Sequence, residues 1–262
     1  MSVEMVRDGR LGGYFNGGDP GTWCPTLWRR FVEKHQIRSV LDIGCGEGQS
    51  TQFFRDLGCD VLGVEGSAEA IRNSPVRDAI ALHDFRDGPF QPGRRFDLIW
   101  TCEFLEHIEE EFLPHVAATL QLADRYILAT HAFPGQRGHH HVNCRPSSYW
   151  IAVLGKLGFA TSLGESLSAR HATLGDHHRV NHFARSGLVG KRVVPFRTQS
   201  DLSSLDLRES AQRPTLSDRC KGAVLYRYFR TMRLAKKLLP GKPKPPRTAA
   251  LRELADDGRR AA

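Results

Sequence analysis

The sequence predicts an α/β protein with an open, mostly parallel sheet of about seven strands and helices on both faces. Short apolar runs of strand length alternate with segments that have helical spacing of apolar residues, which favours right-handed crossovers between parallel strands. A glycine-rich turn follows the first apolar run. The chain has 262 residues, of which 40% are hydrophobic and 25% are charged, enough to bury one core of this kind.

Each element follows from a local pattern. Five buried strands are expected over 39–43, 61–64, 79–82, 96–100 and 126–130, with a closing antiparallel pair over 159–163 and 182–194. Helices are expected over 23–36, 50–57, 68–73, 109–123 and 147–157. Gly58 and Gly158 stand where two of these helices should end.

Composition divides the chain into four parts. These are a glycine-rich segment over 1–22, the α/β domain over 23–196, a polar linker over 197–221 and a basic tail over 222–262. Residues 214–262 hold 13 Lys and Arg against 4 Asp and Glu, whereas the rest of the chain carries a net charge of −1. The overall charge of +8 is therefore a property of the tail and does not indicate a nucleic-acid-binding domain.

The sequence favours a cytoplasmic protein. No apolar run reaches the length of a membrane span, and the first ten residues lack the apolar core of a secretory signal. None of the six cysteines forms a C-x-x-C pair, so reduced thiols are expected. Residues 222–239 predict a basic amphipathic helix, which could contact a membrane surface, bind RNA, dock on a partner or pack on the domain.

A turn of bare main chain carries the functional interpretation. The run from Asp42 to Gly48 reads D-I-G-C-G-E-G, directly after a predicted strand and before a predicted helix. Glycines let the chain turn sharply and let a ligand lie against the backbone, and the helix N-terminus offers free N–H groups. A dinucleotide fingerprint would need a third glycine where Gln49 stands.

Two acids strengthen this interpretation. Glu65 ends the second predicted strand, where a carboxylate can accept hydrogen bonds from both ribose hydroxyls. Asp84 follows the third predicted strand and could meet an adenine amino group, or be an ordinary loop acid.

These residues, together with the stretch from Phe96 to His107, resemble the successive motifs of class I S-adenosylmethionine (SAM)-dependent methyltransferases. The resemblance covers about residues 23–195 and is nearest to the branch that acts on small molecules and glycans. It implies a Rossmann-like fold and SAM as the cofactor. Glu65 departs modestly from the pattern, which has Asp there, but either carboxylate can bridge two hydroxyls.

The resemblance also implies roles for individual residues. Gly44, Gly46 and Gly48 would contact the methionine and ribose parts of SAM, and Cys45 lies in the same turn. Asp42 would lie near the methionine ammonium group, Glu65 on the ribose and Asp84 near the adenine. Glu103, just after the fourth predicted strand, is also expected to bind the cofactor.

The first group of catalytic candidates follows the fourth predicted strand. Glu106 and His107 resemble the Glu-His pair of the family, whose histidine often faces the cofactor. A hydroxyl acceptor must lose a proton to a base, and His or a carboxylate can take it. The alternative is that both residues only cap or orient the next helix.

A histidine-rich loop supplies the second group. Residues 130–143 form a Gly/Pro loop at the end of the fifth predicted strand, which is typical of an active-site lid. His139 or His141 is the favoured base, with Asn143 as a positioning partner. A metal site is not expected, because consecutive side chains diverge and the loop itself contains no acid. His182 and three other histidines after residue 170 are expected at the surface or in a lid.

The sequence therefore predicts SAM-dependent methylation, at oxygen, of a small molecule, sugar or glycan precursor. RNA methylation helped by the tail is the second interpretation, although the motifs of nucleic-acid methylating enzymes are absent after the fourth strand. A SAM-binding regulatory or scaffold protein without turnover is the third.

Overall fold

The computed structural model describes residues 4–7, 11–176 and 181–195. The chain divides into two units, residues 1–226 and 227–262, and all described residues belong to the first. The predicted linker over 197–221 and basic tail over 222–262 lie outside the described residues. None of the helices in the described ranges combines the length and the apolar character that a membrane span requires.

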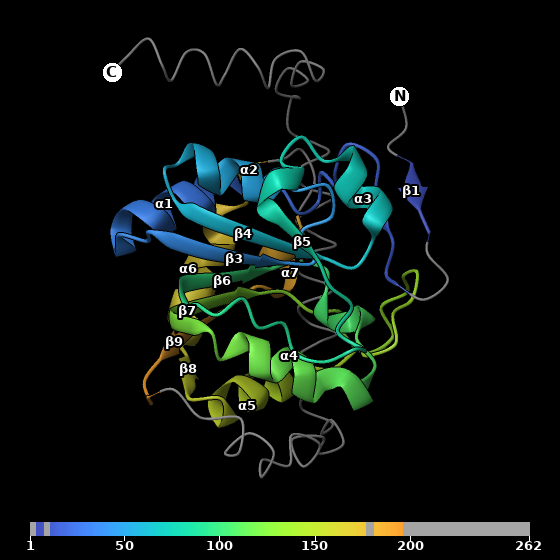
Figure 1. The fold of residues 1–262 in the computed structure, drawn as a ribbon. Helices are drawn as coiled ribbons and strands as arrows, with labels where there is room; N and C mark the ends of the chain where they lie inside the picture. The colour runs from blue at the N-terminus through green and yellow to red at the C-terminus, as the bar shows by residue number, and fades with distance from the viewer. Residues whose placement is uncertain (1–3, 8–10, 177–180, 196–262) are drawn as a thin grey trace, which may run out of the picture. The chain divides into compact units, whose positions relative to one another are not determined.

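A seven-stranded sheet forms the centre of the domain, as predicted (Figure 1). Its order is β5-β4-β3-β6-β7-β9-β8. The strands are β3 (Ser39–Ile43), β4 (Asp60–Glu65), β5 (Ile80–Leu82), β6 (Phe96–Thr101), β7 (Ala123–Ala129), β8 (Phe159–Thr161) and β9 (Leu188–Arg192). The first five are parallel, whereas β9 runs antiparallel to both β7 and β8. The carboxyl ends of β3, β4 and β6 therefore meet at one edge.

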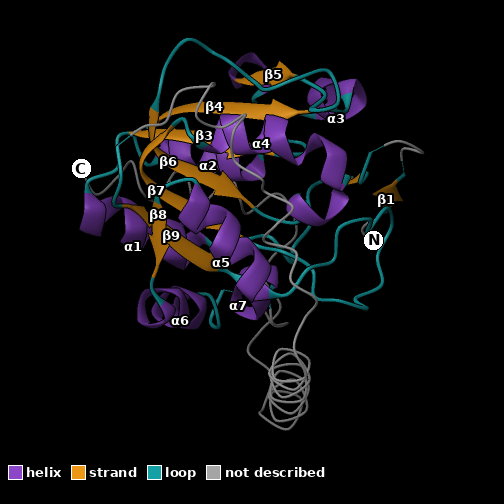
Figure 2. Ribbon diagram, turned by 90° about the horizontal axis from the view of Figure 1, so that it is seen from below, coloured by secondary structure: helices purple, strands orange, loops and turns teal. Residues whose placement is uncertain are grey.

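Helices lie on both sides of this sheet (Figures 1 and 2). They are α1 (Pro25–His35), α2 (Gln49–Asp56), α3 (Ala68–Asn73), α4 (Leu113–Leu120), α5 (Ser147–Lys156), α6 (Leu163–Ala172) and α7 (His182–Ser186). Three 3₁₀ turns span Arg77–Ala79, Leu105–His107 and Glu110–Phe112. The helix predicted over 109–123 is a 3₁₀ turn followed by α4, and it ends at Leu120 because β7 begins at Ala123.

Alternate residues along the central strands fill two separate cores, as a sheet covered on both faces requires. On one face, Ile99 of β6 packs with Val116 of α4 and Trp150 of α5. On the other face, Trp100 packs with Trp28 of α1 and Phe183 of α7. The indole of Trp100 lies 5.3 Å from that of Trp28 and 5.4 Å from the ring of Phe183, measured between centroids.

The strand predicted over 182–194 is only partly correct. Its first part is the helix α7, and only Leu188–Arg192 pairs as β9. Asn181 caps this helix, since its side-chain oxygen accepts a hydrogen bond from the backbone N–H of Ala184 at 2.7 Å. The buried ring of Phe183 against Trp100 outweighs the strand propensity of the segment.

Two features were not predicted. Helix α6 starts at a Ser162-to-Glu165 capping sequence, in which the Ser162 hydroxyl accepts from the Glu165 N–H at 3.3 Å. Within the glycine-rich segment, β1 (Met5–Val6) pairs with β2 (Tyr14–Phe15), where only a loop was expected.

The positive φ of Gly48 at the start of α2 gives a test of the glycine turn. Gly48 has φ of 79°, and a Cβ there would come within 2.8 Å of Val76 Cγ2. Gly58 has φ of 81° but open space around it. We expect Gly58→Ala to destabilise the protein by about 1 kcal/mol through backbone strain alone, and Gly48→Ala by at least about 2 kcal/mol because overpacking is added.

Urea unfolding of the two variants beside the wild type measures both values. Equal losses of stability would contradict the close approach of Gly48 to Val76.

Candidate functional site

The turn after β3 lies against the end of β4. Gly44, Gly46 and Gly48 all have positive φ, at 70°, 57° and 79°. The backbone N–H groups of Gly44 and Cys45 both donate to the carbonyl oxygen of Val64, at 2.9 and 3.2 Å. The turn therefore continues the pairing of the two strands beyond their last ladder bonds.

Glu65 holds the same edge together through its side chain. One carboxylate oxygen accepts from the Gly46 N–H at 2.9 Å and the other from the Ser67 N–H at 2.8 Å. The carboxylate thus points at the glycine turn, where the sequence placed it. Burial raises the pKa of Glu65, although these backbone donors act in the opposite direction.

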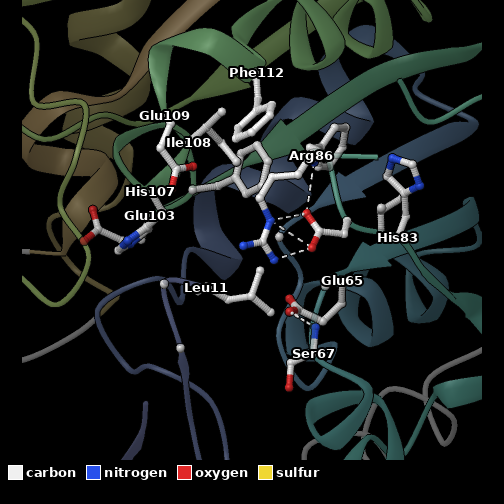
Figure 3. A pocket seen from close by; sticks show the side chains of 18 residues that line it. Leu11, Glu65, Ser67, His83, Arg86, Glu103, His107, Ile108, Glu109 and Phe112 are labelled. Carbon is white, nitrogen blue, oxygen red and sulfur yellow. Dashed lines mark hydrogen bonds and ion pairs between the residues drawn. The ribbon is translucent and has the colours of Figure 1, made fainter. Parts of the chain in front are cut away.

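A pocket opens where the carboxyl ends of β3, β4, β5 and β6 converge (Figure 3). Its walls come from four segments after these strands and from the N-terminal segment. The lining residues are Leu11, Gly12, Gly13, Gly44, Val64, Glu65, Gly66, Ser67, His83, Asp84, Phe85, Arg86, Glu103, Phe104, His107, Ile108, Glu109 and Phe112.

Two side chains partly fill this pocket. Figure 3 shows Leu11 and Arg86 between Glu103 on one side and His83 on the other. The guanidinium of Arg86 donates to both carboxylate oxygens of Asp84, and this pairing lowers the pKa of Asp84. The open space is about 80 Å³, below the roughly 300–1,000 Å³ of typical ligand pockets. An adjoining hollow of about 300 Å³ shares Leu11, Asp84 and Arg86 with this pocket.

Of the eight residues predicted to bind the cofactor, four line the pocket: Gly44, Glu65, Asp84 and Glu103. Cys45, Gly46 and Gly48 form the rest of the turn without lining it. Asp42 is buried below the turn, where it accepts hydrogen bonds from the hydroxyls of Ser50 and Thr51 at 2.6 and 2.7 Å. Its burial raises the pKa of Asp42 to about 6.

Glu103 lies at the opposite end of the pocket in a strained backbone conformation. Its φ of 54° is in the left-handed region, which non-glycine residues rarely adopt outside functional sites. The Glu103 N–H donates to the hydroxyl of Thr130 at 2.8 Å, which fixes this bend to the end of β7.

His182 joins Glu103 to the N-terminal segment, although the sequence placed it at the surface or in a lid. Its Nδ1 lies 3.0 Å from Oε1 of Glu103, and its Nε2 lies 3.2 Å from Oδ2 of Asp19. Burial alone would lower the pKa of His182, but the two carboxylates raise it to about 10. The imidazole is therefore a cation between two acids at neutral pH.

Three of the four predicted catalytic residues lie close together. His107 lines the pocket, and its ring centroid is 5.1 Å from that of His141. The backbone carbonyl of Glu106 accepts from the N–H groups of Val142 and Asn143 at 2.9 and 3.0 Å, so the histidine loop is tied to this turn. His139 is not among the residues that line the pocket.

Burial changes the protonation equilibria of His107 and Glu106. Burial and the nearby His141 together lower the pKa of His107 to about 4, so the imidazole is neutral at pH 7. Nδ1 of His107 lies 3.1 Å from the carbonyl oxygen of His140. Since a carbonyl only accepts, Nδ1 carries the hydrogen and Nε2 keeps its lone pair. Burial and the nearby Glu103 raise the pKa of Glu106 well above its usual range.

Glu103, Glu106 and His141 could also hold a metal ion. Each offers one ligand atom, and these three atoms all lie within 4.8 Å of one another. Neither carboxylate oxygen of Glu106, which is completely buried, has a hydrogen-bond partner among the described residues.

Sequence reasoning missed several residues of the pocket. Arg86 carried a weak signal, because it stands two residues after the candidate acid Asp84. Leu11, Gly12 and Gly13 were assigned to a loop with no role. The contact of Asp19 with His182 joins residues 163 positions apart, and no local pattern in the sequence indicates it.

Comparison with known proteins agrees with this geometry. Residues 16–127 match the family model described as a methyltransferase domain. The ubiquinone biosynthesis O-methyltransferase of Rhodopseudomonas palustris (strain BisA53) is 32% identical over 98 residues, which cover 35% of this chain and 39% of that protein. The chloroplastic tocopherol O-methyltransferase of Arabidopsis thaliana is 29% identical over 110 residues, 37% of this chain and 31% of that protein. The matches thus span about two fifths of the relatives' length or less.

Two solved structures show the same fold. DesVI of Streptomyces venezuelae aligns with a TM-score of 0.50 and 14% identity, over 64% of this chain and 92% of that one. The sugar N-methyltransferase KedS8 of Streptoalloteichus sp. ATCC 53650 aligns with a TM-score of 0.50 and 15% identity, over 74% and 98%. The family match and the glycine turn facing Glu65 thus identify residues 16–127 as a methyltransferase domain, within a sheet that has the fold of KedS8.

Proposed function

We propose that this protein transfers the methyl group of SAM to an oxygen atom of a small molecule, sugar or glycan precursor. The observation that carries the proposal is the pocket between the glycine turn after β3 and the carboxylate of Glu65 at the end of β4. In open α/β sheets, ligands bind at this edge, outside the carboxyl ends of the strands.

The residues of the pocket fit the parts of SAM. The carboxylate of Glu65 can accept hydrogen bonds from two ribose hydroxyls, and Gly44 presents bare main chain to the ligand. Asp84 is placed to accept from an adenine amino group once Arg86 releases it. Bound SAM supplies an activated methyl group, and the protein aligns it with the acceptor.

The acceptor side of the site is the end of the pocket near Glu103 and His107. Nε2 of His107 keeps its lone pair, so it can take a proton from an acceptor hydroxyl. The ring of His141 packs edge-on against that of His107, and the carbonyl oxygen of His140 orients the Nδ1–H of His107. His139 remains a candidate base only if the loop rearranges on binding.

The names of the curated relatives favour oxygen as the methylated atom, since both are O-methyltransferases. Only the methylated atom is inferred from these names, because the match covers 39% and 31% of the two proteins. KedS8, named as a sugar N-methyltransferase, supports the fold alone.

The activity is tested by adding the purified protein to a cell extract, together with SAM that carries a deuterated methyl group. We expect a labelled product in the small-molecule fraction after treatment with ribonuclease. Label found only in RNA would support the second interpretation of the sequence. SAM binding without labelled product in any fraction would support a protein without turnover and would contradict the proposal.

Loss of the Glu65 carboxylate should weaken SAM binding. Glu65→Ala removes the acceptor of the ribose hydroxyls in a buried site, so we expect a loss of more than about 1.4 kcal/mol, or tenfold in Kd. Isothermal titration calorimetry with SAM measures it. Glu33→Ala, an exposed change on α1, serves as the control and should leave Kd unchanged.

Thermal unfolding checks that Glu65→Ala is folded, because the side chain also accepts two backbone N–H groups. If it is not, Glu65→Gln replaces it in the same measurement. A folded variant with the affinity of the wild type would refute the placement of the ribose.

Loss of the His107 imidazole should slow turnover more than it weakens SAM binding. For His107→Ala we expect the rate of label incorporation to fall at least about tenfold, within the usual range for a general base, with a much smaller change in Kd for SAM. His171→Ala, an exposed change on α6, is the control. A wild-type rate in His107→Ala would remove this residue from the mechanism.

A further inference from the structure

We propose that Glu103, Glu106 and His141 bind a divalent transition-metal ion beside the pocket. Their three ligand atoms lie within 4.8 Å of one another, so a single ion placed among them could reach all three. Two carboxylate oxygens and an imidazole nitrogen form a ligand set typical of such ions.

The burial of Glu106 is an independent observation in favour of a cation. This side chain is completely buried, and neither of its oxygens has a hydrogen-bond partner among the described residues. Buried carboxyl groups are almost always hydrogen-bonded, paired or bound to a metal, because desolvation without compensation costs several kcal/mol. A bound cation would supply the partner that Glu106 lacks.

The backbone holds the three ligands in place from two separate segments. Glu103 and Glu106 lie in the turn after β6, and the hydrogen bond from the Glu103 N–H to Thr130 fixes one end of that turn. The histidine loop is anchored to the same turn by the two bonds to the Glu106 carbonyl. The carbonyl oxygen of Gln136 lies 3.1 Å from Nδ1 of His141 and orients its ring, as outer partners of metal-binding histidines do.

Gly138 leaves the room that this ring needs. A Cβ at Gly138 would come within 2.0 Å of Nε2 of His141, so a larger residue would displace the imidazole. Oε1 of Glu103 contacts Nδ1 of His182, so an ion would share this carboxylate with the imidazole. The ligand set is therefore compatible with the interactions already present.

The chemistry of the ligands selects the class of ion. Imidazole favours Zn²⁺, Fe²⁺, Co²⁺ or Ni²⁺ over Mg²⁺ and Ca²⁺, which prefer oxygen ligands alone. Three protein ligands leave at least one coordination position open, as in catalytic zinc sites. Because Glu103 also lines the pocket, the ion would adjoin the space for the acceptor. A role in orienting acceptor oxygens rests on the proposed function, whereas metal binding itself does not.

Titration of the full, untagged chain with Co²⁺ after removal of metals by a chelator tests the site. The visible absorption of protein-bound Co²⁺ reports on binding without any acceptor or SAM. We expect one Co²⁺ per chain in the wild type. Glu106→Gln and His141→Ala should each weaken binding at least about tenfold, since each removes a ligand.

His139→Ala is the matched control, because it removes a histidine from the same run without removing one of the three ligands. We expect it to bind Co²⁺ like the wild type. The proposal is overturned if the wild type binds no Co²⁺, if Glu106→Gln and His141→Ala bind as the wild type does, or if His139→Ala alone loses binding. The last result would indicate adventitious binding by the histidine run.

Folding of the variants is checked by circular dichroism. Glu106→Gln keeps the shape of the buried side chain, and His141→Ala changes a partly buried loop residue, so at least one should fold. Failure of methyl transfer in the extract experiment would leave the Co²⁺ result intact, so the two proposals can fail separately.

Discussion

The carboxylate of Glu65 connects the two strands on which the site is built. Its oxygens accept from the N–H groups of Gly46 and Ser67, and thereby join the turn after β3 to the turn after β4. Glycines with positive φ make this approach possible, because side chains at those positions would strain the turn. Without this link, the two turns would lose the carboxylate that holds them together.

Strain and burial accumulate at the other end of the pocket. Glu103 has a left-handed backbone, Glu106 is a buried carboxyl group without a hydrogen-bond partner in the described part of the chain, and His182 is a cation between two acids. Each of these features costs free energy, so the surrounding fold must compensate for them. Their concentration at one end of one pocket is typical of a functional site rather than of a structural core.

The sheet and the contact between the glycine turn and Glu65 could be predicted because their signals are local. A strand, a glycine turn and a helix follow one another within the run from Ser39 to Asp56, and Glu65 ends the next strand. The three residues proposed to bind a metal could not be found in the same way. The sequence argument against a metal considered acids within the histidine loop, whereas Glu103 and Glu106 reach it from the turn after β6. Helix α7 was missed because a tertiary contact, Phe183 on Trp100, decides its conformation.

The pair formed by Arg86 and Asp84 has a consequence for the energetics of ligand binding. The guanidinium occupies the carboxylate that we propose for the adenine ring, so in that binding mode the protein carries its own competitor for the position. Any measured affinity is therefore the intrinsic affinity reduced by the work of separating this pair. A modest observed Kd would then reflect an internal exchange of partners rather than poor complementarity between ligand and protein.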